Sequence, residues 1–292
     1  MERVECVETF MGTPFQVILI VESSQVESAH LVIKKAFDEV GRIQDAYSRF
    51  STDNELAKLN AEVGEWTDVS EELIGLIQQG EKLKVVTQGA FDLSVKSVLE
   101  GWGYDADYSL QEKKRGSCGL VEMKDGRVRL ECPIEIGGLG KGYAVDQMLK
   151  HLNDFKNICV NAGGDLWAKG VNEKDELWKV GFEHPTDPTQ AIGTVEVDGL
   201  ALACSSPSRR QWRDRHHLVN PKTGEPAKDM MAVYTQSSSV MEADAYATAL
   251  FVMGYEQAKD SLEKFPVEAM LISPKGAIHR SSGFKGELFS AS

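Results

Sequence analysis

A glycine-rich segment with one lysine is the first part of the sequence whose residue types suit chemistry. Residues 136–146 read IGGLGKGYAVD and lie between an expected strand and an expected helix. Backbone N–H groups in such a loop can approach an anion at a helix N-terminus, and Lys141 adds a positive charge. The segment is not a Walker A loop, because Gly142 stands where a hydroxyl would bind magnesium. The residues alone leave two interpretations, a phosphate site and a plain glycine-rich turn.

A second segment holds a carboxylate and a hydroxyl four residues apart. Residues 242–250 read EADAYATAL, so Asp244 and Thr248 share one face if this segment is a helix. Both side chains offer oxygen, the ligand that hard cations such as Mg²⁺ prefer. The alternative is that Asp244 interacts with the helix dipole and Thr248 is an ordinary helical residue.

Two adjacent histidines lie in a polar stretch with turn chemistry, RHHLVNPKTGEP, residues 215–226. A histidine held in a rigid loop can act as a general base near neutral pH. Either His216 or His217 fits this role. The arginines in and before this stretch either bind phosphate or form a solvated face; they are Arg209, Arg210, Arg213 and Arg215.

Two shorter fragments carry weaker signals. NAGGD, residues 161–165, follows a short apolar run, and its glycines allow a tight turn or the close approach of a ligand. GAFDLSV, residues 89–95, sets an aromatic ring beside a carboxylate. Neither fragment identifies a site by itself.

Strands and helices alternate irregularly along the chain that must position these groups. Apolar periodicity predicts helices at 28–47, 70–86, 143–152 and 242–253. Runs of β-forming residues predict strands within 4–20 and at 127–136, 157–160, 178–182, 191–197, 233–237 and 269–272. Ser70 and the cluster at 51–54 are expected helix caps. Because there is no steady βαβ alternation, the pattern favours an α+β fold.

Composition narrows the class of protein. The chain has 292 residues, 42% of them hydrophobic, and a formal net charge of -13. Such a chain has enough apolar residues for a core, and its charge opposes nonspecific binding to nucleic acid or to an anionic membrane. No run approaches the roughly 20 apolar residues of a membrane span, so we expect no membrane insertion.

The cysteines indicate a reducing compartment. The five cysteines are odd in number and form no C-x-x-C pair, which argues against a disulfide framework or a zinc site. The N-terminal residues do not resemble a signal peptide. We therefore expect a cytoplasmic protein, with a trimmed leader as the alternative.

Taken in order, the fragments resemble the ApbE family of FAD:protein FMN transferases. The family's run is M-G-T, Y-S-x-F, S-E-L-x-x-L-N, G-A-F-D-x-[ST]-V, G-G-x-A-K-G-Y-A-V-D, N-A-G-G-D, H-x-x-D-P-x-T-G and A-D-A-x-A-T-A. The matching stretches of this chain are residues 11–13, 47–50, 54–60, 89–95, 137–146, 161–165, 217–224 and 243–249. The resemblance extends over roughly residues 8–275, which is nearly the whole chain.

The resemblance implies both a fold and a reaction. The fold is a single large α+β domain over residues 1–292, related to the T-fold, with two intertwined halves and the flavin cleft between them. The reaction is Mg²⁺-dependent transfer of FMN from FAD to a Ser or Thr hydroxyl of an acceptor flavoprotein, with release of AMP. The protein would then be a phosphotransferase-type enzyme with FAD as its bound substrate.

The resemblance also implies roles for particular residues. The general base would be His217, with His216 as its rival, and the metal ligands would be Asp244, Thr248 and the Gly140 carbonyl. The pyrophosphate would lie on the loop from Gly137 to Lys141. The residues expected to contact FAD are Met11, Tyr47, Ala90, Phe91, Asp92, Gly137, Gly138, Lys141 and Leu218.

Three positions depart from the family pattern. Gly140 replaces the usual alanine, Asn220 replaces an aspartate, and residues 205–210 read SSPSRR in place of S-G-D-Y-E-R. The last change concerns recognition of the acceptor protein. Two other activities are compatible with the same residues, a hydrolase that cleaves FAD to FMN and AMP and a noncatalytic FAD-binding protein.

Overall fold

An eight-stranded antiparallel sheet forms the centre of the computed structural model, which describes residues 1–105, 109–113 and 116–289. The strand order is β1-β2-β6-β7-β10-β15-β16-β17. The strands are β1 Glu2–Phe10, β2 Thr13–Val21, β6 Asn157–Ala162, β7 Asp165–Lys169, β10 Leu200–Ser205, β15 Ala232–Ser237, β16 Glu268–Ile272 and β17 Ile278–Arg280.

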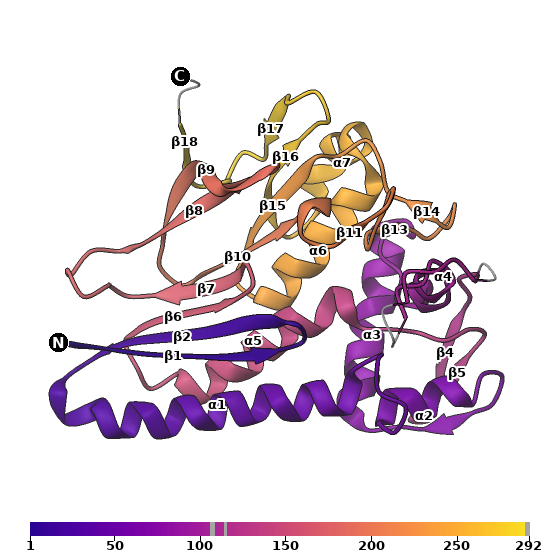
Figure 1. Ribbon diagram of the computed structural model, residues 1–292, viewed down its shortest axis with the longest axis horizontal. Helices are drawn as coiled ribbons and strands as arrows, with labels where there is room; N and C mark the ends of the chain where they lie inside the picture. The colour runs from indigo at the N-terminus through magenta and orange to yellow at the C-terminus, as the bar shows by residue number, and fades with distance from the viewer. Residues whose placement is uncertain (106–108, 114–115, 290–292) are drawn as a thin grey trace.

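Helices cover one face of this sheet (Figure 1). They are α1 Val26–Tyr47, α5 Gly137–Leu152, α6 Val240–Met253 and α7 Tyr255–Ser261. Alternate residues of β2 show why the sheet is covered on both sides. Val17 and Leu19 lie in the core beneath the helices, whereas Ile18 and Ile20 lie in a second core on the opposite face. A strand with both faces apolar must be buried on both.

A smaller sheet supplies the second cover. It has the order β18-β9-β8 and consists of β8 Trp178–His184, β9 Asp187–Val197 and β18 Glu287–Leu288. Trp178 and Phe182 of β8 pack with Ile18 and Ile20 in the second core. The molecule therefore has three layers, helices, large sheet and small sheet, and the expected α+β class is confirmed.

A lobe at the right of Figure 1 follows α1 in the chain. It contains α2 Glu55–Ala61, α3 Glu71–Val86, α4 Lys96–Gly101 and a sheet of β3 Thr67–Asp68, β5 Arg127–Leu130 and β4 Val121–Lys124. The N-caps of α2 and α3 are residues that the sequence predicts as helix caps. Asn54 accepts from the backbone N–H of Ala57 at 2.8 Å, and Ser70 accepts from that of Leu73 at 3.2 Å.

Several short 3-10 turns and two-residue strands connect the larger elements. They are the 3-10 turns η1 Ser23–Gln25, η2 Leu93–Val95, η3 Pro207–Arg209 and η4 Leu262–Lys264, and the strands β11 Gln211–Trp212, β12 Arg215–His216, β13 Val219–Asn220 and β14 Glu225–Pro226. In the part of the chain that the structure describes, no helix combines the length and apolar character needed to span a membrane.

Three local predictions were wrong. The glycine-rich segment is not a loop before a helix, because α5 already begins at Gly137. The strand expected over 127–136 ends at Leu130, shortly before Pro133, which has no N–H to donate. The polar stretch around the histidines is not a plain loop, because it forms the hairpins β11–β12 and β13–β14.

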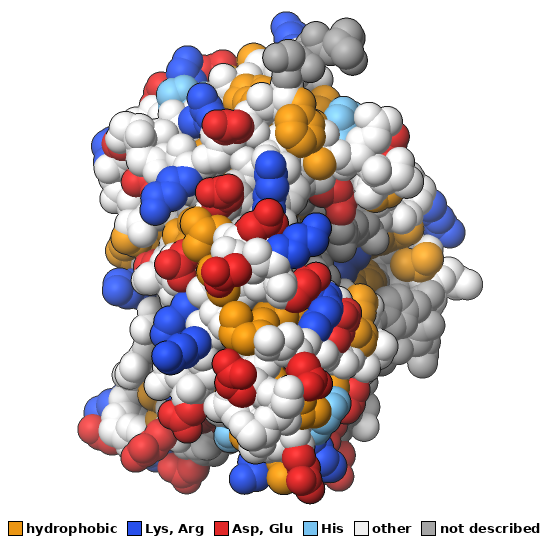
Figure 2. All heavy atoms as spheres, turned by 90° about the vertical axis from the view of Figure 1, so that its left-hand side faces the viewer, with side chains coloured by type: hydrophobic (Ala, Val, Ile, Leu, Met, Phe, Trp, Pro, Cys, Tyr) orange, Lys and Arg blue, Asp and Glu red, His pale blue; other side chains and the backbone are white. Residues whose placement is uncertain are grey.

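Charged side chains of both signs are interspersed over the face seen in Figure 2. Acidic and basic groups alternate there, and hydrophobic side chains lie singly between them. This arrangement is typical of a solvated surface.

Candidate active site

A cavity of about 670 Å³ collects residues from distant parts of the chain. Its walls come from the end of α1, the stretch around residues 90–99, the first turns of α5, the start of β7, one side of α6 and residues 204–221. Apart from the rival base His216, every residue to which the sequence assigned a role in the site lies on this wall; they are Met11, Tyr47, Ala90, Phe91, Asp92, Gly137, Gly138, Gly140, Lys141, His217, Leu218, Asp244 and Thr248.

A lysine between two carboxylates forms the polar centre of the cavity. Nζ of Lys141, from α5, lies 3.0 Å from Oδ2 of Asp244, from α6, and also donates to Oδ2 of Asp165, at the start of β7. Burial raises the pKa of Asp165, and the negative charge of Asp244 raises it further. Burial lowers the pKa of Lys141, but the two carboxylates outweigh burial and raise it above its ordinary value.

Hydroxyl groups lie beside this centre. Oγ of Ser205, at the end of β10, is 3.4 Å from Oγ1 of Thr248, which follows Asp244 by one helical turn. Among the described residues, no group of three His, Cys, Asp or Glu side chains could hold a metal ion. A cation here would depend on carboxylate, hydroxyl and backbone oxygens together. That donor set fits Mg²⁺, which prefers oxygen and keeps part of its water shell.

Glycines of α5 let other segments approach its first turns. A Cβ on Gly138 would lie 2.9 Å from Cε2 of Phe91, and a Cβ on Gly142 would lie 2.5 Å from Cα of Met241. The first glycine thus accommodates the ring of the GAFD segment, and the second accommodates the backbone of α6. Glycine is a poor helix former, so these close contacts explain why the helix has glycine at both places.

The two histidines have different surroundings. His216 is held by the backbone, because its Nε2–H donates to the Ala227 carbonyl at 2.9 Å and its Nδ1 accepts from the Leu218 N–H at 3.2 Å. His217 lines the cavity, and its buried Nδ1 has no hydrogen-bond partner among the described residues. Burial, with a smaller contribution from the Arg210 charge, lowers the pKa of His217 to about 3. Its imidazole is therefore neutral at pH 7, which is the form that a general base has before it takes a proton.

An aromatic wall that the sequence did not predict borders the same cavity. The guanidinium of Arg49 lies 4.2 Å from the ring centroid of Phe50 and 4.3 Å from that of Tyr104. The ring of Tyr104 in turn lies 5.1 Å from that of Trp212. Arg49 and Phe50 belong to the YSRF fragment, which is part of the ApbE pattern and could have indicated these two residues. Tyr104 and Trp212 stand far apart in the sequence, and no motif connects them.

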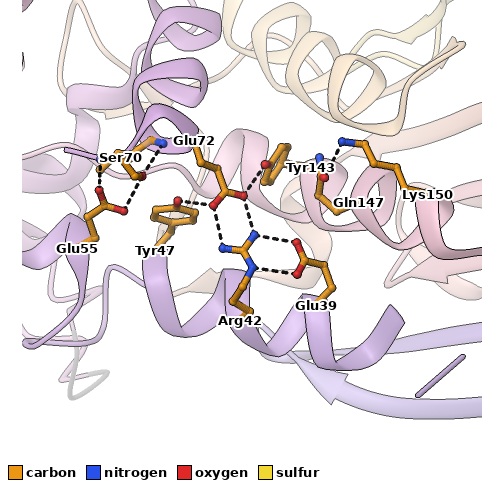
Figure 3. Close-up of polar contacts among 10 residues, drawn as sticks. Glu39, Arg42, Tyr47, Glu55, Ser70, Glu72, Tyr143, Gln147 and Lys150 are labelled. Carbon is orange, nitrogen blue, oxygen red and sulfur yellow. Dashed lines mark hydrogen bonds and ion pairs between the residues drawn. The ribbon is translucent and has the colours of Figure 1, made fainter. Parts of the chain in front are cut away.

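Two of the expected FAD contacts direct their polar atoms into the protein. The Asp92 carboxylate lies 2.9 Å from Nζ of Lys84 and accepts from the Ser94 N–H at 2.9 Å. The Tyr47 hydroxyl donates to Oε2 of Glu72 at 2.7 Å (Figure 3). These groups position the cavity wall, so only the remaining surfaces of Tyr47 and Asp92 can face a ligand.

A comparison with protein-family models explains the order of these segments. The model of the ApbE family matches residues 11–271. This chain belongs to the ApbE family. The matched region begins at Met11 and includes all the residues proposed for the site.

Individual ApbE relatives resemble the chain over most of its length. The FAD:protein FMN transferase of Vibrio cholerae is 25% identical, over 97% of this chain and 90% of that protein. The enzyme of the same name from Klebsiella pneumoniae is 24% identical, over 94% of this chain and 84% of that protein.

Solved ApbE structures share the fold. The ApbE protein of Thermotoga maritima superposes with a TM-score of 0.83 at 26% identity and covers 96% of this chain and 97% of its own. The flavin transferase ApbE of Vibrio cholerae superposes with a TM-score of 0.82 at 23% identity, covering 97% of this chain and 98% of its own. The expected ApbE-like fold is therefore confirmed.

The departures from the ApbE pattern have local explanations at two positions. A Cβ on Gly140 would meet only Ile136, at 3.7 Å, so alanine and glycine both fit there. Asn220 accepts from the backbone N–H groups of Lys222 at 3.0 Å and Thr223 at 3.3 Å, a turn-closing role that an aspartate fulfils equally. In the third departure, Ser206 and Arg210 line the cavity.

Proposed function

We propose that this chain is an FAD:protein FMN transferase, which moves FMN from FAD to a Ser or Thr hydroxyl of an acceptor flavoprotein and releases AMP. The observation that carries the proposal is the shared cavity wall. Lys141, Asp244, Thr248 and His217 come from three separate segments and border one space of about 670 Å³. The names of the relatives support the same activity.

His217 is the proposed general base. Its neutral imidazole would take the proton from the acceptor hydroxyl while that oxygen attacks the phosphorus next to the FMN half. A bond forms between the acceptor oxygen and this phosphorus, and the bond from the phosphorus to the AMP oxygen breaks. A positioned base contributes about 10²–10⁴-fold to such a step. The backbone contacts of His216 support assigning the role to His217.

The start of α5 is the proposed pyrophosphate site. Helix N-termini attract anions, and Lys141, in the second turn of α5, lines the cavity together with Gly137 and Gly138. When held by Asp244, Thr248 and the Gly140 carbonyl, Mg²⁺ would neutralise the pyrophosphate charge and stabilise the leaving phosphate. A helical carbonyl retains a second lone pair after its hydrogen bond, so the Gly140 oxygen can still coordinate.

The flavin and adenine rings need apolar and backbone surface. We assign that surface to Met11, Tyr47, Ala90, Phe91, Asp92, Gly137, Gly138 and Leu218, all of which border the cavity. Phe91 and Leu218 are almost fully buried, which favours a preformed site. Because the cavity wall draws on residues from Met11 to Val252, we propose that residues 1–292 act as one functional unit.

We further propose a cytoplasmic location. Cys6, Cys118, Cys132 and Cys159 form no disulfide bond, and the last two are buried. Unpaired cysteines are usual in a reducing compartment. Cell fractionation with an antibody against the native protein tests this directly, and recovery from the cell envelope would contradict it.

One assay separates the candidate activities. The protein is incubated with FAD and Mg²⁺, with and without an acceptor flavoprotein, and both AMP and covalent flavin fluorescence are measured. AMP together with flavin bound to the acceptor, and only when acceptor is present, supports the transferase. AMP without acceptor identifies a hydrolase, and bound FAD with no AMP in either case identifies a binding protein. An Asp244→Ala variant that kept its metal-dependent activity would contradict the metal assignment.

A further inference from the structure

Lys141 shares its ammonium between two carboxylates that belong to different layers of the fold. Asp244 lies on α6 and Asp165 at the start of β7, where it pairs with Ala162 of β6. Among the described residues, the Asp165 carboxylate makes its hydrogen bonds and ion pairs with Lys141 alone. Asp165 is therefore a buried acid that the proposed mechanism does not use.

We propose that Lys141 competes with Mg²⁺ for Asp244, and that Asp165 is the positioning residue that draws the ammonium away when the cation binds. The proposal rests on the proposed function, because it assumes that Asp244 is a ligand of Mg²⁺. It assigns to Asp165 a role in metal affinity that it exerts through Lys141.

Charge balance among these three side chains supports the competition. The exposed fractions of the side chains are 5% for Asp165 and 9% for Asp244, and that of Lys141 is 18%. Two buried carboxylates need a nearby positive charge, because an uncompensated buried charge is strongly unfavourable. The ammonium of Lys141 supplies it, and its contact with Asp244 at 3.0 Å occupies one of the oxygens that a cation would use.

Binding of a divalent cation changes that balance. Two positive groups on one carboxylate repel each other, so the ammonium must give up Asp244 for the cation to bind well. The lysine stem is flexible, and the ammonium already has Asp165 as a second partner. With Asp165 in place, the ammonium keeps a carboxylate partner when it leaves Asp244. Without Asp165, Asp244 is the remaining partner, and Lys141 competes more strongly with the cation.

A double-mutant cycle on metal affinity tests the proposal. Mg²⁺ binding is measured by isothermal titration calorimetry, without FAD, for the wild type, Asp165→Asn, Lys141→Met and the double variant. We expect Asp165→Asn to weaken Mg²⁺ binding about 10-fold and Lys141→Met to tighten it, because coupled neighbours interact by this order of magnitude. The double variant should bind like Lys141→Met, since Asp165 acts only through the lysine.

Additivity would overturn the proposal. If Asp165→Asn weakens binding equally in the wild-type and Lys141→Met backgrounds, Asp165 acts on the cation directly. Asp165→Glu is the conservative variant and should recover most of the wild-type affinity. Glu135→Gln is the matched charge control, because Glu135 lines the same cavity and accepts from the Gly137 N–H at 2.8 Å. An equal loss in Glu135→Gln would also overturn the proposal, since any acidic residue would then serve.

Two further measurements distinguish a failure of this proposal from misfolding of a variant and from a failure of the proposed function. Thermal unfolding in EDTA shows whether each variant is folded, and Lys141→Gln replaces Lys141→Met in the cycle if the latter does not fold. A wild type that binds no Mg²⁺ overturns this proposal together with the metal assignment. A wild type that binds Mg²⁺ but transfers no flavin contradicts the proposed reaction and leaves the cycle intact as a test.

Discussion

Asp146 of α5 caps the neighbouring helix, because its Oδ1 accepts a hydrogen bond from the backbone N–H of Val240 at 2.9 Å. Its Oδ2 accepts from the Ser239 hydroxyl at 2.7 Å and from the Met241 N–H at 3.1 Å. A carboxylate from one helix thus satisfies the free N–H groups at the start of another. Since Lys141 lies on the first helix and Asp244 on the second, this contact sets the relative position of the two halves of the polar centre.

Removing this cap should affect both stability and the site. We expect Asp146→Ala to lower the free energy of unfolding by about 1–3 kcal/mol, because three donors lose a half-buried acceptor. Mg²⁺ affinity should fall as well, since α6 is no longer held in register. Urea denaturation and calorimetry measure the two effects. Asp45→Ala, at an exposed position of α1, is the control. Unchanged stability in Asp146→Ala would mean that Ser239 caps α6 by itself.

Two glycines of one helix should respond to alanine in opposite directions. Gly140 has room for a Cβ, which would meet only Ile136, so Gly140→Ala should stabilise the protein by about 0.5–1 kcal/mol. A Cβ on Gly142 would lie 2.6 Å from the Met241 nitrogen, so Gly142→Ala must push the helices apart. We expect a loss of about 1–3 kcal/mol for it. Chemical denaturation of the pair gives the comparison, and effects of the same sign would contradict the packing argument.

Features that depend on neighbours in the chain were predictable. The caps Asn54 and Ser70 and the four-residue spacing of Asp244 and Thr248 needed only helical periodicity. The start of α5 was predicted wrongly, because glycine disfavours helix by intrinsic propensity. Packing overrides that propensity, since Phe91 requires the absence of a side chain at Gly138.

Features that depend on long-range contacts were not predictable from one sequence. The ion pair of Lys141 with Asp165 joins residues 24 positions apart, and the ring contact of Tyr104 with Trp212 joins segments still farther apart. No local pattern distinguishes His216 from His217 either. A hydrogen bond to the carbonyl of Ala227, eleven positions away, makes the distinction.

The histidine assignment gives a kinetic prediction. His217→Ala should lower kcat for flavin transfer by about 10²–10⁴-fold, the usual contribution of a general base, and leave Mg²⁺ binding nearly unchanged. His216→Ala is the matched comparison. It removes the contact with Ala227 and should chiefly lower the melting temperature. Single-turnover kinetics with saturating FAD separate the chemical step from binding. Full activity in His217→Ala would assign the proton transfer to another group.

A network around Glu72 joins three helices near the cavity (Figure 3). The Glu72 carboxylate accepts from Arg42 of α1 at 2.7 Å and from the hydroxyls of Tyr47 at 2.7 Å and Tyr143 at 2.6 Å. The hydrogen bond from Arg42 is the largest cause that lowers the pKa of Glu72, from an ordinary value of 4.5 to about 2. The network thus favours the ionised carboxylate in the folded state.

The direction of this shift fixes its dependence on pH. Because the folded pKa is below the unfolded one, the stabilisation is fully present above the unfolded value of 4.5 and is lost as the pH falls toward 2. Partial exposure of Glu72 reduces the contribution to the order of 1 kcal/mol. Urea unfolding of the wild type and Glu72→Gln should therefore differ most at about pH 6 and converge only as the pH approaches about 2.

Glu71→Gln is the matched control for this experiment, since Glu71 is the preceding residue of α3 and is exposed. Its substitution should leave the free energy of unfolding within about 0.5 kcal/mol of the wild type at both pH values. The free energies of unfolding of wild type and Glu72→Gln could instead differ by the same amount at every pH. That result would show that the shape of the Glu72 side chain, rather than its charge, holds the three helices together. If the free energies of unfolding of wild type and Glu72→Gln converge at low pH, and Glu71→Gln stays equal to the wild type, the acid sensitivity arises from the Glu72 network, which includes Tyr47.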